Sequence, residues 1–527
     1  MEEQGNVSEI KSSSKDKNNL KDEDTSLNKQ DVLKEKVKNL IKEKNFILLI
    51  SIISIGFILR LYYMILTKNQ AEWWDAAEYL SMASNWVFNV PFEFNPQRPI
   101  LLPLFEAIIL KLGGTEIVLK IILELIPSTL IIFFSYLIVK EMYNEKLALI
   151  TGFFMAVFWL AIFNTVRLHA DILLMLFMYL CVYFFWRGYV KDGKYYHVWL
   201  MGVFLALAFM TKLFGAILGF IILVFLLITD KLKFLKNKHI WFALIILILM
   251  ILPYLVWQNM MYGKFNAFFL GSHVLSEPSG VTARPVGWSI LSYIPWMLTT
   301  PIFILFLVGV LTLYTLILSI DLIIKNKSKD TYNDLFLVLW ILIPLIYLVF
   351  FERSAEDRWL LPIALPLFIL ASKGIYFVYD LIKKYHKTIG VVVLFALILI
   401  GGYFQISRAD EIINLKKNSY NEVRQASLWL KDNTGPEDII FSKSYPQMTY
   451  YTKRKIVGFS VNETQFKEDV LKYKPKYLVL SVFEQHGDTL KYPDTFNNSL
   501  QPVQAYFQDQ ERTQPILVIY QFTNYDL

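Results

Sequence analysis

Long apolar segments separated by short polar ones run through most of the chain. Eleven of them are long enough, or nearly so, to cross the ~30 Å hydrocarbon core of a membrane as helices. The pattern therefore predicts a polytopic α-helical membrane protein with a transmembrane part over 45–405. The predicted spans are 46–66, 116–139, 147–163, 168–186, 196–211, 213–229, 240–257, 298–324, 333–351, 359–380 and 389–405.

The apolar segment from Ile100 to Leu110 does not fit this pattern. At about 1.5 Å of rise per residue it is too short to cross the membrane, and Pro99 and Pro103 stand at its start. We therefore expect an interfacial or re-entrant helix over 100–112, preceded by a first external loop over 67–99.

The charges of the connecting loops support this choice, because lysine-rich loops lie on the cytoplasmic side of membrane proteins. Without a crossing at 100–110, all the lysine-rich loops fall on the same side as the basic N-terminal tail. The N-terminus is then expected in the cytoplasm. The segments around Asp75, Arg167, Lys212 and Arg358 share the outer face.

The N-terminal tail, residues 1–44, is polar and is predicted to be disordered. Near its end Leu33, Val37, Leu40 and Ile41 recur at helical spacing among lysines. This spacing fits a basic amphipathic helix on the membrane surface and a solvated helix equally well.

The pattern changes again after Tyr403. A helix is expected over about 421–430, and a small extracytoplasmic α/β domain over 406–527. Its predicted strands are 438–442, 455–459, 476–481 and 516–522.

Composition agrees with an integral membrane protein, since 55% of the 527 residues are hydrophobic and 18% are charged. The formal net charge is +7, but the lysines stand between apolar runs, so we expect no nucleic-acid partner. The one cysteine, Cys181, lies inside an apolar run. Intramolecular disulfides and cysteine metal sites are therefore excluded.

Asp75 is the first candidate for chemistry. It lies among tryptophans and small residues, in Trp73-Trp74-Asp75-Ala76-Ala77, where a carboxylate is sheltered enough for its basicity to be tuned. Tryptophans also collect at membrane interfaces, so a simple interfacial loop would show the same pattern.

Four cations are expected on the same face as Asp75. Lys212 stands in a nearly unbroken apolar passage, so either an anion faces it or its ammonium snorkels. Arg167 is four residues before Asp171, which also fits an internal salt bridge on one helical face. Arg98 precedes Pro99 and would also serve as a membrane anchor. Arg358 follows Glu352, Glu356 and Asp357, with which an ion pair is plausible.

One sheltered carboxylate and four cations suit a lipid-linked phosphate better than a neutral solute. Basic groups stabilise a leaving phosphate, and a carboxylate can deprotonate an attacking hydroxyl. No Ser/His/Asp set, phosphate-binding glycine loop or metal-spaced His/Cys cluster is visible. The alternatives are a transporter or flippase of a phosphate-bearing lipid or solute, and a non-catalytic assembly protein whose C-terminal domain binds a partner.

At these residues the chain resembles the membrane-embedded GT-C glycosyltransferases, in particular the protein O-mannosyltransferase-like branch (glycosyltransferase family 39) and the aminoarabinose transferases. Asp75 occupies the position of the Asp in the family's Asp-Glu pair, and Ala76 replaces the Glu. Tyr79 also fits, and Ala170-Asp171 resembles the family's Pro-Asp without its proline. The other matching motifs are Arg98-Pro99-Ile100-Leu101, Thr211-Lys212-Leu213-Phe214-Gly215 and Arg358-Trp359-Leu360-Leu361-Pro362.

The resemblance implies an inverting glycosyltransferase of a prokaryotic plasma membrane. It would transfer a sugar from a polyprenyl (dolichyl or undecaprenyl) phosphate donor to a hydroxyl of a protein, lipid or glycan on the outer face. Asp75 would be the catalytic base, and Ala76 implies that it works without an adjacent second carboxylate. No resident cofactor is expected, and the use of a divalent metal stays open. The donor phosphate would bind Arg98, Lys212, Arg358 and Arg167, and the sugar or acceptor would contact Glu78, Tyr79, His169 and Asp171.

Overall fold

The computed structural model describes residues 43–526 apart from 97, 264–286, 315, 317–330, 353–355, 485–486, 508–510 and 512. Residues 1–42 of the predicted disordered tail, which include the segment 33–41, and part of the predicted span 298–324 lie outside the described residues. Residues 43 and 44, the end of that predicted tail, are helical. The chain divides into two compact units, Met1–Ser54 and Ile55–Leu527. The described part of the first unit is helical, and the following paragraphs concern the second.

Among the described residues, seven helices are long and apolar enough to cross a membrane. Two bent helix pairs pass the same test when each counts as one span, and two shorter apolar helices cover Tyr195–Thr211 and Leu213–Thr229. All overlap predicted spans, although the first half of one bent pair, Gly287–Leu298, precedes the predicted span 298–324. Together they confirm an integral membrane protein of helical type. The exact count of eleven stays a prediction.

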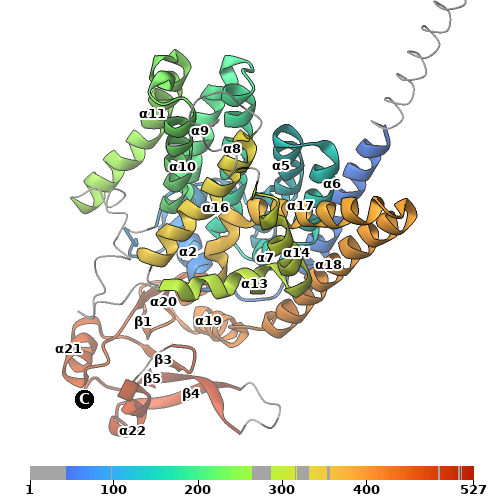
Figure 1. Ribbon diagram of the computed structural model, residues 1–527. Helices are drawn as coiled ribbons and strands as arrows, with labels where there is room; N and C mark the ends of the chain where they lie inside the picture. Colours follow the sequence, from blue (N-terminus) through green and yellow to red (C-terminus); the bar gives the residue numbers. More distant parts are fainter. Residues whose placement is uncertain are drawn as a thin grey trace, which may run out of the picture. The chain divides into compact units, whose positions relative to one another are not determined.

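Figure 1 shows how the helices of this part are arranged. A helix, α3, lies inside the segment 100–112, and its interfacial or re-entrant position stays a prediction. The helices are α2 (Trp74–Phe88), α3 (Leu101–Lys111), α4 (Glu116–Lys120), η1 (Ile121–Leu125), α5 (Ile126–Met142), α6 (Glu145–Val157), α7 (Trp159–Thr165), α8 (Ala170–Phe185), η2 (Trp186–Val190), α9 (Tyr195–Thr211), η3 (Leu213–Gly215), α10 (Ala216–Thr229), η4 (Lys233–Lys236), α11 (Lys238–Tyr262), η6 (Gly287–Ser292), α13 (Tyr293–Leu298), α14 (Thr300–Leu311), α16 (Tyr332–Phe350), η7 (Asp357–Ile363), α17 (Ala364–Lys383) and α18 (Lys387–Lys416).

Polar side chains stabilise the break between α6 and α7, where the helix axis bends by 48°. The buried Arg60 donates hydrogen bonds to the carbonyl oxygens of Met155 (3.1 Å) and Ala156 (2.7 Å). The amide of Trp159 instead donates to the side chain of Gln405 on α18, at 3.0 Å. Backbone groups released by the bend are thus paired by side chains from two other helices, as an apolar environment requires.

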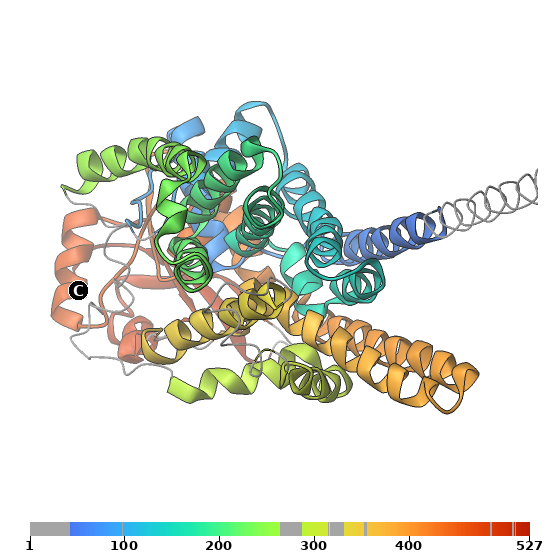
Figure 2. The ribbon, with the colours of Figure 1, turned by 45° about the horizontal axis from the view of Figure 1, so that its top comes forward.

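α14 and α17 approach each other closely because both carry a glycine at the contact. A Cβ atom added to Gly309 would lie 1.8 Å from the carbonyl oxygen of Leu370, and one added to Gly374 would lie 1.9 Å from that of Leu305. Small residues allow such backbone contact between membrane helices. Figure 2 shows α17 next to α18, which follows it after a short turn.

The C-terminal residues form a five-stranded sheet of order β2-β1-β3-β5-β4. β1 pairs in parallel with β2 and β3, whereas β5 is antiparallel to β3 and β4. The sheet confirms a small α/β part in this region, although β4 was not predicted; the boundary at 406 stays a prediction, and α18 runs past it to Lys416. The elements are α19 (Asn421–Asn433), β1 (Ile439–Ser442), α20 (Tyr445–Thr452), β2 (Lys455–Val457), α21 (Glu463–Tyr473), β3 (Tyr477–Ser481), η8 (Gly487–Lys491), α22 (Tyr492–Thr495), β4 (Leu500–Phe507) and β5 (Pro515–Phe522).

The sheet part contacts the membrane part mainly through α20, which packs on α2. The Ser81 hydroxyl donates to the carbonyl oxygen of Pro446 at 3.0 Å, and the Glu72 amide donates to the Tyr451 hydroxyl at 2.9 Å. Lys453 donates to the Ser84 hydroxyl at 3.0 Å. The C-terminal residues therefore pack against α2 and hold it by hydrogen bonds.

Candidate active site

Asp75 lies in the first turn of α2, a helix inside the segment predicted as a loop. Nine consecutive residues of this helix, 76–84, are buried. Carboxylates in the first helical turn are favoured by the helix dipole. α2 thus fixes Asp75 on a rigid element, with its side chain 19% exposed.

Arg98 binds two carboxylates of α2. Its Nη2 atom lies 2.5 Å from Oδ1 of Asp75, and its Nε atom lies 2.7 Å from Oε2 of Glu78. The same guanidinium lies 5.4 Å from the ring centre of Tyr79. Arg98 is therefore tied to α2 at three residues rather than free as a membrane anchor.

Arg358, in η7, links Asp75 to α8. Its Nη2 atom lies 2.7 Å from Oδ2 of Asp75, and its Nη1 atom lies 3.7 Å from Oδ2 of Asp171 and 3.5 Å from Nδ1 of His169. Its Nε atom also pairs with Glu356 at 2.5 Å, in agreement with the ion pair expected from the preceding acidic residues.

Lys212 does have the anionic partner that its apolar surroundings suggest. It stands in extended conformation between α9 and η3, and its ammonium lies 2.8 Å from Oδ1 of Asp171. The ammonium also lies 4.0 Å from the ring centre of Trp359. Asp171 thus joins the second and third cations of the site. Six residues from five segments form one alternating series of charges: Glu78, Arg98, Asp75, Arg358, Asp171 and Lys212.

These ion pairs set the protonation states at the site. Burial raises the pKa of the Asp75 carboxyl, but the charges of Arg98 and Arg358 lower it more strongly, and the pKa lies well below its usual range. Burial lowers the pKa of His169 to about 3, and the charge of Arg358 acts in the same direction. At neutral pH Asp75 is therefore ionised and His169 is neutral.

The expected salt bridge between Arg167 and Asp171 is not formed. Arg167 precedes α8, and its guanidinium lies 3.7 Å from the ring centre of Phe163 and 4.2 Å from that of Trp73. It is 2% exposed, and burial lowers its pKa to about 9. The structure does not bring Arg167 into the series of ion pairs that holds the other three cations.

A group of buried acids behind α2 was missed by the sequence interpretation. Glu72 pairs with Lys120 at 2.5 Å. Among the residues that the structure describes, neither carboxylate oxygen of the fully buried Glu106 has a hydrogen-bond partner. Glu124, also fully buried, accepts a hydrogen bond from the His169 amide at 3.0 Å. The sequence signal was available, since acidic side chains inside apolar segments are costly and therefore rare.

Aromatic rings border the site on the side of the C-terminal sheet. The ring of Trp74, next to Asp75, meets that of Tyr445 on α20 at 5.0 Å, and Tyr445 lies 6.3 Å from Phe92. All three rings are partly exposed. The position of Tyr445 shows that the C-terminal part contributes a side chain close to the candidate base.

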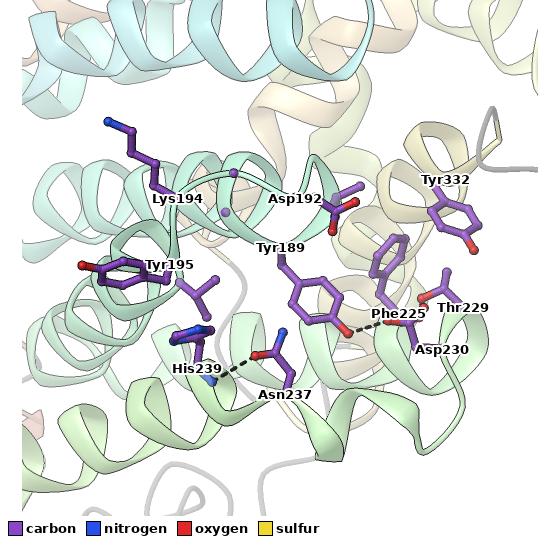
Figure 3. A pocket seen from close by; sticks show the side chains of 14 residues that line it. Tyr189, Asp192, Lys194, Tyr195, Phe225, Thr229, Asp230, Asn237, His239 and Tyr332 are labelled. Carbon is purple, nitrogen blue, oxygen red and sulfur yellow. Dashed lines mark hydrogen bonds between the residues drawn. The ribbon is translucent and has the colours of Figure 1, made fainter.

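A polar cavity of about 460 Å³ lies away from these residues (Figure 3). It is lined by Tyr189, Lys194 and Tyr332 among others, and the Tyr189 hydroxyl donates to Asp230. It lies beside the end of η2 and the start of α9, whereas Asp171 and Lys212 stand at the opposite ends of α8 and α9. The helices separate the two regions by roughly 24 Å, at about 1.5 Å per residue. No predicted site residue lines this cavity.

Among the residues that the structure describes, no group of three or more His, Cys, Asp or Glu is arranged to hold a metal ion. The use of a metal stays open.

The fold is similar to that of two proteins of known structure. ArnT from Cupriavidus metallidurans bound to undecaprenyl phosphate has a TM-score of 0.63 and 13% identity, over 88% of this chain and 97% of that chain. The apo oligosaccharyltransferase of Archaeoglobus fulgidus has a TM-score of 0.61 and 14% identity, over 84% of this chain and 70% of that chain. Its complex with an inhibitory peptide and a dolichol-phosphate matches equally, with a TM-score of 0.61.

The chain is thus a membrane protein with the GT-C glycosyltransferase fold, which confirms the resemblance seen in the sequence. More narrowly, residues 97–257 match the family of dolichyl-phosphate-mannose-protein mannosyltransferases. A comparison with curated protein sequences found no match.

Proposed function

We propose that this protein transfers a sugar from a polyprenyl phosphate donor to a hydroxyl acceptor, with inversion at the sugar carbon. The observation that carries the proposal is the position of Asp75 between Arg98 and Arg358. Two cations that bind one carboxylate can bind a phosphate in its place. The lipid phosphates named in the ArnT and oligosaccharyltransferase structures support the donor class.

In this proposal, the donor phosphate competes with Asp75 for Arg358 and Arg98, while Lys212 binds it from the side of α9. Basic groups that face the leaving phosphate stabilise the charge it gains in the transition state. Loss of its ion pairs raises the pKa of Asp75 toward the ordinary value for a carboxylate. Donor binding would therefore prepare the base.

Asp75 then accepts the proton of the attacking hydroxyl. The sugar carbon passes through an oxocarbenium-like transition state, so the proton leaves late and an ordinary carboxylate is basic enough. Attack opposite to the leaving phosphate inverts the configuration. Glu78, Tyr79, His169 and Asp171 are proposed to contact the sugar or acceptor.

We place the site on the outer face of a prokaryotic plasma membrane, with the N-terminus in the cytoplasm and the C-terminal sheet outside. The lysine-rich loops, all on the opposite side, support this orientation. The acceptor, a protein, lipid or glycan, would enter beside α20, where Tyr445 lies close to Trp74. The two transferases that share the fold give the transporter alternative no support.

Product analysis tests the proposal. The purified full chain is incubated with a panel of polyprenyl-phosphate sugars and candidate acceptors, with Asp75→Asn as the control. We expect one donor to yield free polyprenyl phosphate and a glycosylated acceptor, and the variant to lose about 100-fold or more of the rate. Wild-type transfer by Asp75→Asn at equal expression would exclude Asp75 as the base, and movement of the intact donor across vesicles without bond cleavage would favour a flippase.

A further inference from the structure

Glu124 lies in an irregular turn of a long helix. The segment Glu116–Met142 is continuous, but Ile121–Leu125 within it forms a π-helical turn. Pro127 is the second residue after this turn. A proline has no amide to donate to the carbonyl four residues earlier, and its ring clashes with that carbonyl, so it favours a wider turn at this point. Such π turns often occur at functional sites.

The π turn presents Glu124 to the segment that leads into α8. One oxygen of the fully buried carboxyl accepts a hydrogen bond from the amide of His169, at 3.0 Å; this amide also lies 3.0 Å from the carbonyl oxygen of Arg167. The second oxygen, Oε2, is buried and has no hydrogen-bond partner within the described part of the chain. Burial of a carboxyl is costly, so the contact is not explained by solvation at a surface.

The segment held in this way carries two side chains of the site. Nδ1 of His169 lies 3.5 Å from Arg358, and Asp171 contacts Lys212 at 2.8 Å and Arg358 at 3.7 Å. His169 is the residue that precedes α8, in extended conformation, and no side chain caps the helix start. Its amide is therefore a point at which the path of the chain into α8 is fixed.

We infer that Glu124 is a positioning residue: through the His169 amide it fixes the segment 169–171, and through Asp171 it sets the places of Lys212 and Arg358. Only the expected effects on the transfer rate and the donor KM rest on the proposed function. Misplacement of reacting groups by about 1 Å can cost up to about 100-fold in rate. The neighbouring Glu106 supplies a matched control, because it is an equally buried acid but has no partner on this segment.

Four variants test the inference: Glu124→Ala, Glu124→Gln, Pro127→Ala and Glu106→Ala. Gln keeps an accepting oxygen, so we expect Glu124→Gln to stay within about twofold of wild type, whereas Glu124→Ala loses about tenfold or more in kcat, as for a lost buried hydrogen bond. The donor KM should rise in Glu124→Ala, since both cations depend on Asp171. Pro127→Ala should show part of this loss, and Glu106→Ala none.

Hydrogen–deuterium exchange of the segment 166–171 gives a readout that does not need activity. We expect faster exchange in Glu124→Ala and unchanged exchange in Glu106→Ala. If wild type transfers no sugar but this difference is found, the proposed function fails and the positioning role stands. Three results would overturn the inference. The first is unchanged exchange and kinetics in Glu124→Ala, the second is an equal loss in Glu124→Gln and Glu124→Ala, and the third is an equal loss in Glu106→Ala and Glu124→Ala.

Discussion

Arg358 lies 2.7 Å from Asp75, although the two residues stand far apart in the sequence. The same guanidinium also contacts Asp171 at 3.7 Å. Arg358 is thus the point where the candidate base and the start of α8 meet. Its planar group can serve both carboxylates at once, which a lysine ammonium does less well.

We predict that Arg358→Ala raises the donor KM and lowers kcat, and that Arg358→Lys recovers only part of the loss. Lysine keeps the charge but lacks the fork that joins Asp75 and Asp171. A loss of about 10- to 100-fold in kcat/KM is expected for Ala. Steady-state kinetics at varied donor concentration measures both constants, and full activity of Arg358→Lys would show that charge alone suffices.

Variants of the ion pair between Lys212 and Asp171 should affect stability and activity differently. Lys212→Met leaves the buried Asp171 with a weaker partner, so the melting temperature is expected to fall. In Asp171→Asn/Lys212→Met both charges are gone, and the melting temperature should return toward wild type while transfer stays low. Thermal unfolding in detergent and transfer rates of the two single variants and the double variant complete the cycle. Additive changes in melting temperature would show that the two side chains do not interact.

His169 should make stability depend on pH. Its pKa is about 3 in the folded protein and about 6.5 when unfolded, so the unfolded state binds the extra proton between these values. Stability is therefore lost as the pH falls from about 6.5 toward about 3. His169→Gln removes the group that takes up this proton. Between about pH 7 and about pH 4.5, in matched buffers, its melting temperature should therefore fall less than that of wild type. An unchanged pH dependence would contradict the burial of a neutral imidazole.

The close contact of α14 and α17 predicts a clear difference between two glycines. Gly374→Ala should destabilise the protein strongly, because the added Cβ atom would lie 1.9 Å from the Leu305 carbonyl oxygen. Gly152→Ala is the matched control, since its Cβ atom would meet only the Tyr136 side chain at 3.7 Å. Expression yield and melting temperature measure the difference. Equal stability of the two variants would mean that the two helices can move apart at no cost.

Local patterns in the sequence predict much of the fold. Apolar runs predicted where the spans lie, and lysine-rich loops predicted a common side for Asp75, Arg98, Lys212 and Arg358, which the structure joins in one series of ion pairs. The helix α2 was missed because its residues 76–84 are all buried, so that Asp75, Glu78 and Ser81, which recur at helical spacing, do not form the exposed polar face of a surface helix. β4 was missed because Pro502 lies beside a bulge in this edge strand.

The partners inside the site depend on distances between remote segments, which no local pattern contains. The spacing of Arg167 and Asp171 suggested a pair, but a helix begins between them at Ala170, and Asp171 pairs with Lys212 instead. The contact between Glu124 and His169 likewise needs the π turn and the start of α8 to be placed together.

The alternating series of three carboxylates and three cations has a consequence for the charge that the site must bear. The series is neutral, and a bound sugar phosphodiester adds one negative charge. When the sugar leaves, the phosphate of the product gains a second negative charge, while Asp75 becomes neutral by taking the proton of the acceptor. The total is therefore the same before and after transfer, so this poorly solvated region never has to accommodate an added charge as the reaction proceeds.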